Sequence, residues 1–250
     1  MPLLDDPRLR CAQVAAVQLP LGSVLRVRPV FVRPGLALVV PFRAALFDLD
    51  GVIVDTARHH YLAWRRLAAE LGFDFTPEAA EGIKGVRRDQ ALEVVLAAGS
   101  VRVDPAEKPR LAERKNAWYV ESIEDVDESE LLAGARPLLE ELRQHGVSVA
   151  LVSASRNAPF LLERLGIRGL FDAVVDGNAG LPPKPDPQIV LRAAELLDAD
   201  PAACFVVEDA ESGLAGARAA GMAAIGVGEP SVLPSADLVV RSLLDIDVVH

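Results

Sequence analysis

The sequence predicts an α/β protein with a mostly parallel sheet, because strand-like runs and helical stretches alternate along it. Short runs rich in Val, Ile and Ala alternate with amphipathic stretches, a pattern typical of parallel strands joined by crossover helices. Acidic pairs stand where two of these runs end, in "FDLDG" and "VVEDAESG". Because open parallel sheets bind ligands at the carboxyl ends of their strands, the acidic pairs also predict where a site lies.

Length, charge and cysteine content exclude several classes of protein. A chain of 250 residues suffices for one domain, or for a core domain with a smaller insertion. The formal charge of −10 disfavours nucleic-acid binding, which needs a basic surface. Arg26, Arg28 and Arg33 interrupt the apolar N-terminal stretch, so we expect no membrane span. Cys11 and Cys204 suggest neither a disulfide framework nor a zinc site, so we expect the protein in the reducing cytoplasm. We also expect a monomer.

The elements alternate along the second half of the chain, and one stretch interrupts the alternation. The strand candidates are 44–48, 147–155, 171–176, 204–209 and 223–227, and the helix candidates between them are 157–167, 187–197 and 211–222. From about 57 to 125 no such strand occurs, and the amphipathic patterns there read as helices. We therefore expect a core domain of residues 42–56 and 132–250, with residues 57–131 inserted as a helical cap.

The first 41 residues carry no motif. They are apolar but lack a regular period, and they contain several prolines. We expect a poorly ordered extension or a start codon placed too early, because disorder concentrates at termini. Removal of residues 1–40 should then leave activity largely unchanged. The alternative is that this segment forms an extra strand or an oligomer contact.

The acidic pairs predict a magnesium site. Asp48 and Asp50 follow one strand candidate, and Glu208 and Asp209 end another. If the two strands are neighbours, four carboxylates share one pocket, which requires a cation or strongly raised pKa values. Oxygen ligands without His or Cys favour Mg²⁺. The alternative is that Asp48 caps a turn and that the later pair stabilises a helix start.

Two other strand ends carry hydrogen-bond donors and positive charge. The run "SASRN" places Ser153, Ser155 and Asn157 at a helix start, where small side chains and backbone N–H groups can bind an anion. The run "PPKPDP" places Lys184 in a proline-stiffened loop. A fixed ammonium there could neutralise the charge of a phosphoryl group.

Taken together, these motifs resemble a known superfamily. The segments "DLDGVIVDT", "SAS", "KPDP" and "VVEDAESG" resemble, in order and separation, the four motifs of the haloacid dehalogenase superfamily of phosphotransferases. Segments 82–92, 113–120 and 153–167 are similar to the sugar-phosphate mutases of that superfamily, including their cap. The likeness runs from about residue 42 to about residue 230. It implies a Rossmann-like core with a mostly parallel sheet and an inserted α-helical cap.

The resemblance implies roles for the core residues. Asp48 would be the nucleophile that becomes an aspartyl-phosphate, and Asp50 the general acid/base, with its backbone carbonyl on Mg²⁺. The metal ligands would be Asp48, Asp50, Glu208 and Asp209. Ser153 and Lys184 would hold the transferring phosphoryl group. Residues i and i+2 of an extended segment face the same side, which suits the spacing of the two catalytic aspartates.

The resemblance also implies a set of substrate-binding residues, some in the cap and some in the core, with a cleft between them. From the cap these residues would be His60, Trp64, Lys84, Gly85, Val86, Arg87, Arg88 and Lys115, and from the core Ala154, Ser155, Arg156 and Asn157. The sequence departs from the family pattern at Arg156, where Lys is usual, and at Ala91 and Ala210, where Ser is usual. These departures leave the reaction class untouched and bear on sugar specificity.

The implied activity is the interconversion of β-D-glucose 1-phosphate and D-glucose 6-phosphate through a bound β-glucose 1,6-bisphosphate, which also primes the enzyme. The alternative is a Mg²⁺-dependent sugar-phosphate phosphatase, in which water attacks the same aspartyl-phosphate. Arg88 and Lys115 favour the mutase, since a phosphatase has little use for a second phosphate site. The intact Asp48, Asp50, Lys184 and Asp209 disfavour a non-catalytic binding protein, and the magnesium site disfavours a dehalogenase.

Overall fold

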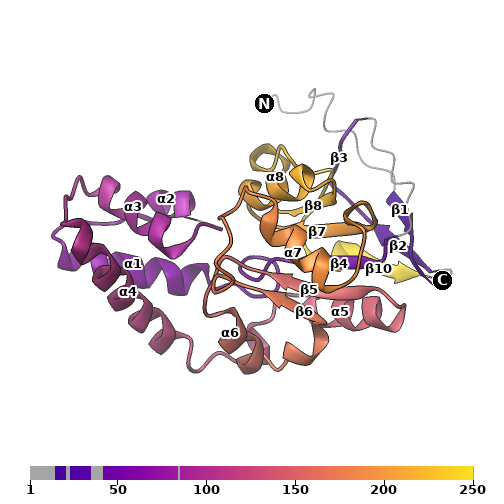
Figure 1. The fold of residues 1–250 in the computed structure, drawn as a ribbon, viewed down its shortest axis with the longest axis horizontal. Coiled ribbons are helices and arrows are strands. Elements are labelled where there is room, and N and C mark those ends of the chain that lie inside the picture. Colours follow the sequence, from indigo (N-terminus) through magenta and orange to yellow (C-terminus); the bar gives the residue numbers. More distant parts are fainter. Residues whose placement is uncertain (1–14, 21–22, 35–41, 84, 250) are drawn as a thin grey trace, which may run out of the picture.

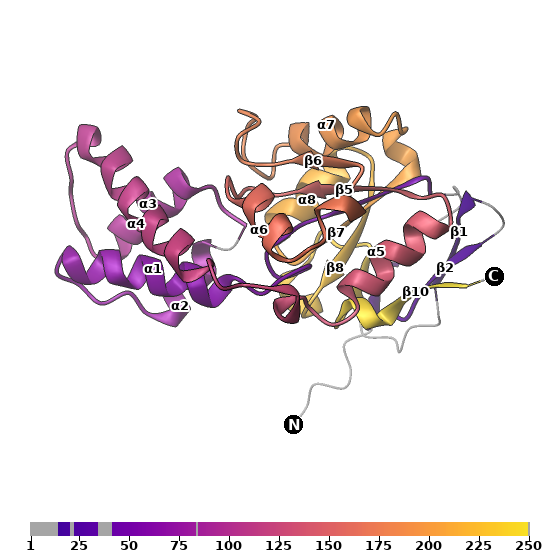
Figure 2. The same ribbon diagram turned by 90° about the horizontal axis from the view of Figure 1, so that it is seen from below.

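The computed structural model describes residues 15–20, 23–34, 42–83 and 85–249. The chain forms a core built around a β-sheet and a group of helices that projects from one end of it (Figures 1 and 2). The strands are β1 Ala15–Gln18, β2 Val24–Val27, β3 Phe31–Val32, β4 Ala44–Phe47, β5 Ser148–Val152, β6 Ala173–Val175, β7 Cys204–Glu208, β8 Ala223–Val227, β9 Leu238–Val240 and β10 Ile246–Val249. The α-helices are α1 Ala57–Glu70, α2 Pro77–Ala80, α3 Arg88–Ala98, α4 Lys108–Ser122, α5 Ala135–Gln144, α6 Ala158–Arg164, α7 Gln188–Leu196 and α8 Glu211–Ala219.

The main sheet confirms the predicted fold class. Its strand order is β3-β9-β8-β7-β4-β5-β6, and every neighbouring pair is parallel except β3 with β9. All residues of β4 and β7 are buried, which explains their near-continuous apolar sequences, because a parallel strand is covered on both faces. The order places β4 between β7 and β5, so the ends of these three strands meet at one edge of the sheet.

The cap consists of helices α1 to α4, and it has its own apolar core. Trp64, Leu67, Leu92 and Val95 are among the buried residues between these helices. The chain crosses between core and cap at two adjacent points. Val54 pairs with Leu131 in an antiparallel bridge, and the Leu132 N–H donates to the Ile53 carbonyl at 2.9 Å.

The described part of the N-terminal extension is not a poorly ordered tail. Strands β1, β2 and β10 form a second, antiparallel sheet, in which Leu25 pairs with Val248. Strand β3 adds to the edge of the main sheet beside β9. Leu25 and Val27 are completely buried in the same apolar cluster as β4. The alternative of extra strands therefore holds for residues 15–18, 24–27 and 31–32, and the irregular hydrophobic pattern concealed them because each strand is very short. Residues 1–14 lie outside the described part of the chain.

Among the described residues, no helix combines the length and the apolar composition needed to cross a membrane.

Candidate active site

The predicted acidic cluster forms where β4 and β7 end. The two strands are in register at Phe47 and Val207, so Asp48 and Glu208 leave the sheet side by side. The Asp48 N–H extends the pairing by donating to the Val207 carbonyl at 3.0 Å. Carboxylate oxygens of Asp48, Glu208 and Asp209 all lie within 4.8 Å of one another. Asp48 and Glu208 are almost completely buried, so their charges require partners.

Lys184 provides one of these partners. Its ammonium lies 2.6 Å from Asp48 Oδ1 and 2.7 Å from Glu208 Oε2, with only 3% of the side chain exposed. Burial opposes the charge of Lys184, but the attraction of Asp48 and Glu208 prevails and raises its pKa. Burial, together with the nearby charge of Asp48, raises the pKa of Glu208 to about 8. One ammonium therefore does not neutralise the cluster, and a further cation would be stabilised here.

The cluster fits Mg²⁺. Its donors are all carboxylate oxygens, the ligand type that this hard cation prefers. Two glycines keep the space around the carboxylates open. A Cβ atom at Gly51, which has a φ of +82°, would collide with the Asp209 carboxylate, and a Cβ at Gly213 would collide with that of Glu208. When bound, the metal would neutralise phosphoryl oxygens as a Lewis acid.

Asp50 lies beside the cluster and has a different environment. The hydroxyl of Thr56, the residue that precedes α1, donates to Asp50 Oδ1. Burial and then the nearby charge of Asp48 raise the pKa of Asp50 to about 6, although the Thr56 hydrogen bond lowers it. A carboxyl group that titrates near neutral pH can both give and accept a proton during turnover.

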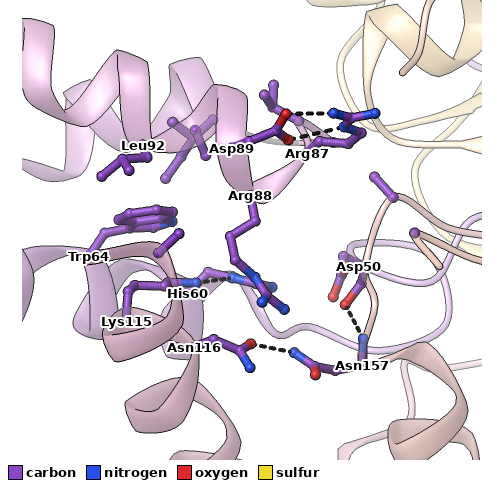
Figure 3. Close-up of a pocket in the computed structure, with 18 of the residues that line it drawn as sticks. Asp50, His60, Trp64, Arg87, Arg88, Asp89, Leu92, Lys115, Asn116 and Asn157 are labelled. Atoms are coloured by element: carbon purple, nitrogen blue, oxygen red, sulfur yellow. Dashed lines mark hydrogen bonds and ion pairs between the residues drawn. The ribbon is translucent and has the colours of Figure 1, made fainter. Parts of the chain in front are cut away.

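A cleft of about 1010 Å³ separates the cap from these carboxylates (Figure 3). The cleft brings together most residues expected from the sequence, namely Asp48, Asp50, His60, Trp64, Gly85, Val86, Arg87, Arg88, Lys115, Ala154, Ser155, Arg156, Asn157 and Asp209. Ser153 and Glu208 are buried and Lys184 nearly so, and none of the three lines the cleft. Lys84 lies outside the described residues.

The cap side of the cleft carries a buried cation. Lys115 is 2% exposed, lies 2.8 Å from His60 Nδ1 and stands over the rings of Trp64 and Tyr119. Burial, followed by repulsion from Lys115 and Arg88, keeps the pKa of His60 well below its usual value. This shift favours the neutral imidazole, and the ammonium form of Lys115, which has no acceptor atom, would then donate the hydrogen bond to His60. Burial and the Arg88 charge lower the pKa of Lys115 to about 7.

The core side of the cleft is the loop after β5. The Ser153 hydroxyl accepts a hydrogen bond from the Ser155 N–H at 3.0 Å, and the Ser155 hydroxyl accepts one from the Asn157 N–H at 3.2 Å. These bonds fix the loop with Ala154 and Arg156 at the cleft. The loop faces Arg88, which points into the middle of the cleft (Figure 3).

The cap loop before α3 touches the core. Gly85 has a φ of +65°, and a Cβ there would come within 2.9 Å of the Ala210 Cβ. The small residue at 210, one of the departures from the family pattern, thus lies directly against the cap loop. Arg87, expected to bind substrate, is paired with Asp89 and donates to the Leu181 carbonyl at 3.4 Å. It lies at the rim of the cleft, on the opposite side from Asn157 (Figure 3).

Sequence reasoning did not assign three residues that the structure places at the site. Thr56 bonds Asp50, Tyr119 stacks on His60 with ring centroids 4.0 Å apart, and Asn116 bonds Asn157. For Tyr119 a signal was available, because residues four positions apart share a helix face and Lys115 was expected at the cleft. No such spacing pointed to Asn116, which is adjacent to Lys115, or to Thr56.

Comparisons with known proteins agree with this geometry. A family model described as haloacid dehalogenase-like hydrolase matches residues 42–221. The chain therefore belongs to the haloacid dehalogenase-like hydrolase family. Within it, the chain is 42% identical to the β-phosphoglucomutase of Bacillus subtilis over 82% of its own length and 91% of that protein's.

Two further relatives cover a similar share of the chain. A crystal structure of β-phosphoglucomutase from Clostridium difficile has 38% identity and a TM-score of 0.78, covering 81% of this chain and 92% of that one. A phosphorylated carbohydrates phosphatase of Thermotoga maritima is 32% identical over 72% of this chain and 82% of its own length. Both a mutase and a phosphatase are thus similar to this chain.

Proposed function

We propose that the protein is a β-phosphoglucomutase, an isomerase that interconverts β-D-glucose 1-phosphate and D-glucose 6-phosphate. The observation that carries this proposal is that a carboxylate cluster suited to Mg²⁺ lies opposite two cap cations across one cleft. Asp48 and Asp209 line the core wall with Lys184 bound directly behind Asp48, and Arg88 and Lys115 line the cap wall. A sugar carrying two phosphates fits this arrangement, because one phosphate would meet Mg²⁺ and Lys184 and the other would meet the cap cations. The 42% identity to a β-phosphoglucomutase supports the assignment.

The residues of the core wall account for phosphoryl transfer. A carboxylate oxygen of Asp48 attacks phosphorus, the bond from phosphorus to the sugar oxygen breaks, and Asp48 becomes an aspartyl-phosphate. Asp50, with a pKa near 6, gives its proton to the departing sugar oxygen and later takes the proton of the attacking hydroxyl. Lys184 is already in place beside Asp48 and stabilises the charge of the transferring group. Asp48, Glu208, Asp209 and the Asp50 carbonyl would hold Mg²⁺.

The cap residues account for the second phosphate. Arg88 points into the cleft, where its guanidinium can bind a phosphate in a bidentate manner. Ser155, Arg156 and Asn157 face it from the core wall. In the bisphosphate intermediate one phosphate would lie at Asp48 and the other at Arg88, and reversal of the sugar exchanges them. His60, Lys115 and Trp64 would contact the sugar between the two phosphates.

The phosphatase alternative uses the same chemistry up to the aspartyl-phosphate. It differs only in the acceptor, which is water instead of a sugar hydroxyl. The Thermotoga maritima relative shows that the family supports such an outcome. The mutase is favoured because Lys115 is buried, Arg88 is partly buried and both line the cleft, a costly arrangement for cations without an anionic ligand.

Three further attributes belong to this proposal. The β-glucose 1,6-bisphosphate would prime the enzyme by phosphorylating Asp48. The partners would be sugar phosphates only, without nucleic acid, and the protein would act as a monomer. Its location would be the cytoplasm, which suits a chain whose buried Cys204 is a free thiol.

The test is mutase turnover of Asp48→Asn and Asp50→Asn, followed through NADP-linked oxidation of the glucose 6-phosphate formed. Asp48→Asn should abolish turnover because the amide is no nucleophile, and Asp50→Asn should reduce it by at least about 100-fold, since it removes the proton transfer. Asp74→Asn, at an exposed cap residue that forms an ion pair with Arg65, is the matched control and should be unaffected. Retained turnover in Asp48→Asn would refute the proposal.

A further inference from the structure

Among the described residues, two hydrogen bonds join the cap to the core across the mouth of the cleft, away from the two chain crossings. Asn157 Nδ2 donates to Asn116 Oδ1 at 2.9 Å, and Arg87 Nη1 donates to the Leu181 carbonyl at 3.4 Å. Figure 3 shows the two sites on opposite sides of Arg88. We refer to these two contacts as the cap latch.

Asn157 makes its latch contact in place of a more usual one. An asparagine at the N-cap of a helix normally accepts a hydrogen bond from a backbone N–H of the first turn. Asn157 is the N-cap residue of α6 but forms no such bond, and its amide reaches across the cleft to α4. Its own N–H is bound to Ser155, so the residue is fixed from both sides. The orientation of the Asn157 amide therefore depends on Asn116.

Arg87 is also held in place for its latch contact. Asp89 binds its guanidinium at 3.0 and 2.5 Å, which restricts the side chain before it meets the core. The Leu181 carbonyl belongs to the loop that leads to Lys184. The cap latch thus ties the cap to the two core loops that carry Lys184 and the residues facing Arg88.

The cap latch affects closure of the cleft because the cap can rotate about its two connections to the core. The cap is joined to the core by two adjacent chain crossings at Val54 and Leu131, and domains joined in this way commonly move by hinge rotation. The fraction of molecules with a closed cleft then depends on the contacts at the mouth. A single hydrogen bond has a modest net effect, which corresponds to roughly a 2- to 10-fold change in this population.

We infer that Asn116 and Arg87 are positioning residues that hold the cap shut over the phosphorylated Asp48, and thereby determine how often water replaces a sugar hydroxyl as the acceptor. This inference rests on the proposed function. In the unwanted reaction the oxygen of water attacks phosphorus, and the bond from phosphorus to the Asp48 oxygen breaks. Free phosphate leaves, the Asp48 carboxylate is restored, and the proton of water passes to Asp50 and then to solvent. Opening of the latch admits that water.

The first experiment measures the free phosphate formed per glucose 6-phosphate for the wild type, Asn116→Ala, Asn157→Ala and the double variant, with saturating Mg²⁺. Asn116→Ala should raise this ratio by roughly 2- to 10-fold. When Asn157→Ala is already present, Asn116→Ala should not raise the ratio further, because the amide that binds Asn116 is already absent. A general disturbance of α4 would act equally in both backgrounds.

Arg87→Ala should raise the same ratio, because it removes the other half of the latch. The matched control is Arg114→Ala, on the same helix as Asn116. Arg114 forms an ion pair with Glu70 within the cap. The control should leave the ratio unchanged. An unchanged ratio in Asn116→Ala, or an equal increase in the Asn157→Ala background, would overturn the inference.

A second measurement separates the latch from the assignment of the reaction. Enzyme phosphorylated on Asp48 by acetyl phosphate is freed of donor, and its loss of phosphate to water is followed without sugar. Asn116→Ala should lose phosphate several times faster than the wild type, whichever acceptor is the natural one. If the wild type makes no glucose 6-phosphate, the proposed function fails; equal rates of phosphate loss in the two proteins refute the latch.

Discussion

Replacement of Lys184 by Met should destabilise the protein strongly in the absence of metal. The ammonium is 3% exposed and lies within 2.7 Å of two carboxylates that are 5% and 1% exposed. Removal of one partner from a buried ion pair typically costs about 3–5 kcal/mol, because the remaining charges stay buried without compensation. For a chain of this size, where each kcal/mol corresponds to about 2–4 °C, the midpoint of thermal unfolding should fall by roughly 6–20 °C.

The assay is urea unfolding of wild type and Lys184→Met, with a chelator and then with Mg²⁺. The metal should recover part of the loss in the variant, because a cation that binds only the folded state stabilises it. Lys108→Met is the control. Lys108 binds Glu93 at 2.7 Å on the cap surface, with 32% and 56% of the two side chains exposed, and such pairs contribute about 1 kcal/mol or less. A loss below 1 kcal/mol for Lys184→Met, or no response to Mg²⁺, would refute the reasoning.

Three further predictions concern the N-terminal sheet, the cap cation and the acid/base group. Leu25→Ala should lower the free energy of unfolding by about 2–5 kcal/mol, because Leu25 is fully buried, whereas Leu244→Ala, at a side chain that is 58% exposed, should change it little. Lys115 has a folded pKa of about 7, below its usual 10.5, so the unfolded chain binds more protons between these pH values and stability should rise with pH there. Lys115→Met should flatten this rise, which has a limit of about 1.4 kcal/mol per pH unit for one proton, and an equal slope in both proteins would contradict the pKa shift. Thr56→Val removes the hydrogen bond that lowers the pKa of Asp50, so the limb of the turnover–pH profile that reports Asp50 should move to higher pH. Thr76→Val, at a helix start in the cap, is the control and should leave that limb in place.

The core of the fold and its site were predictable because strong local signals coincide there. β4 and β7 are continuous apolar runs, and each ends in an acidic pair, so the parallel-sheet rule brings Asp48 close to Glu208 once the two strands are neighbours, as the structure shows them to be. The register of the two strands then fixes the distance between the carboxylates. The resemblance to the haloacid dehalogenase superfamily extended this to the cap, where Arg88 and Lys115 line the cleft as expected.

The N-terminal strands could not be predicted in the same way. Strands of two to four residues are too short to show alternation, and β2 is stabilised by β10, which lies more than 200 residues further along the chain. Only the tertiary pairing reveals such an element. Arg87 illustrates a similar limit within the site. Adjacent residues of a loop share a composition but point in different directions, and the sequence did not show that Asp89 turns Arg87 toward the core.

The contact between Asn116 and Asn157 forms because the Asn157 side chain makes no N-capping hydrogen bond with α6. The sequence "SASRN" predicts that Asn157 begins a helix, and a capping role for its side chain is the ordinary expectation. Its contact with α4 arises only when the cap and the core meet. Contacts between domains are set by their relative placement, which local patterns do not encode.

The central claim is that Asp48 passes a phosphoryl group between two positions of one sugar while the cap excludes water. The most direct measurement is phosphorus NMR of the wild type with Mg²⁺, β-glucose 1-phosphate and a trace of β-glucose 1,6-bisphosphate. We predict conversion to glucose 6-phosphate with little free phosphate. Free phosphate as the main product would contradict the claim and would identify the protein as a sugar-phosphate phosphatase.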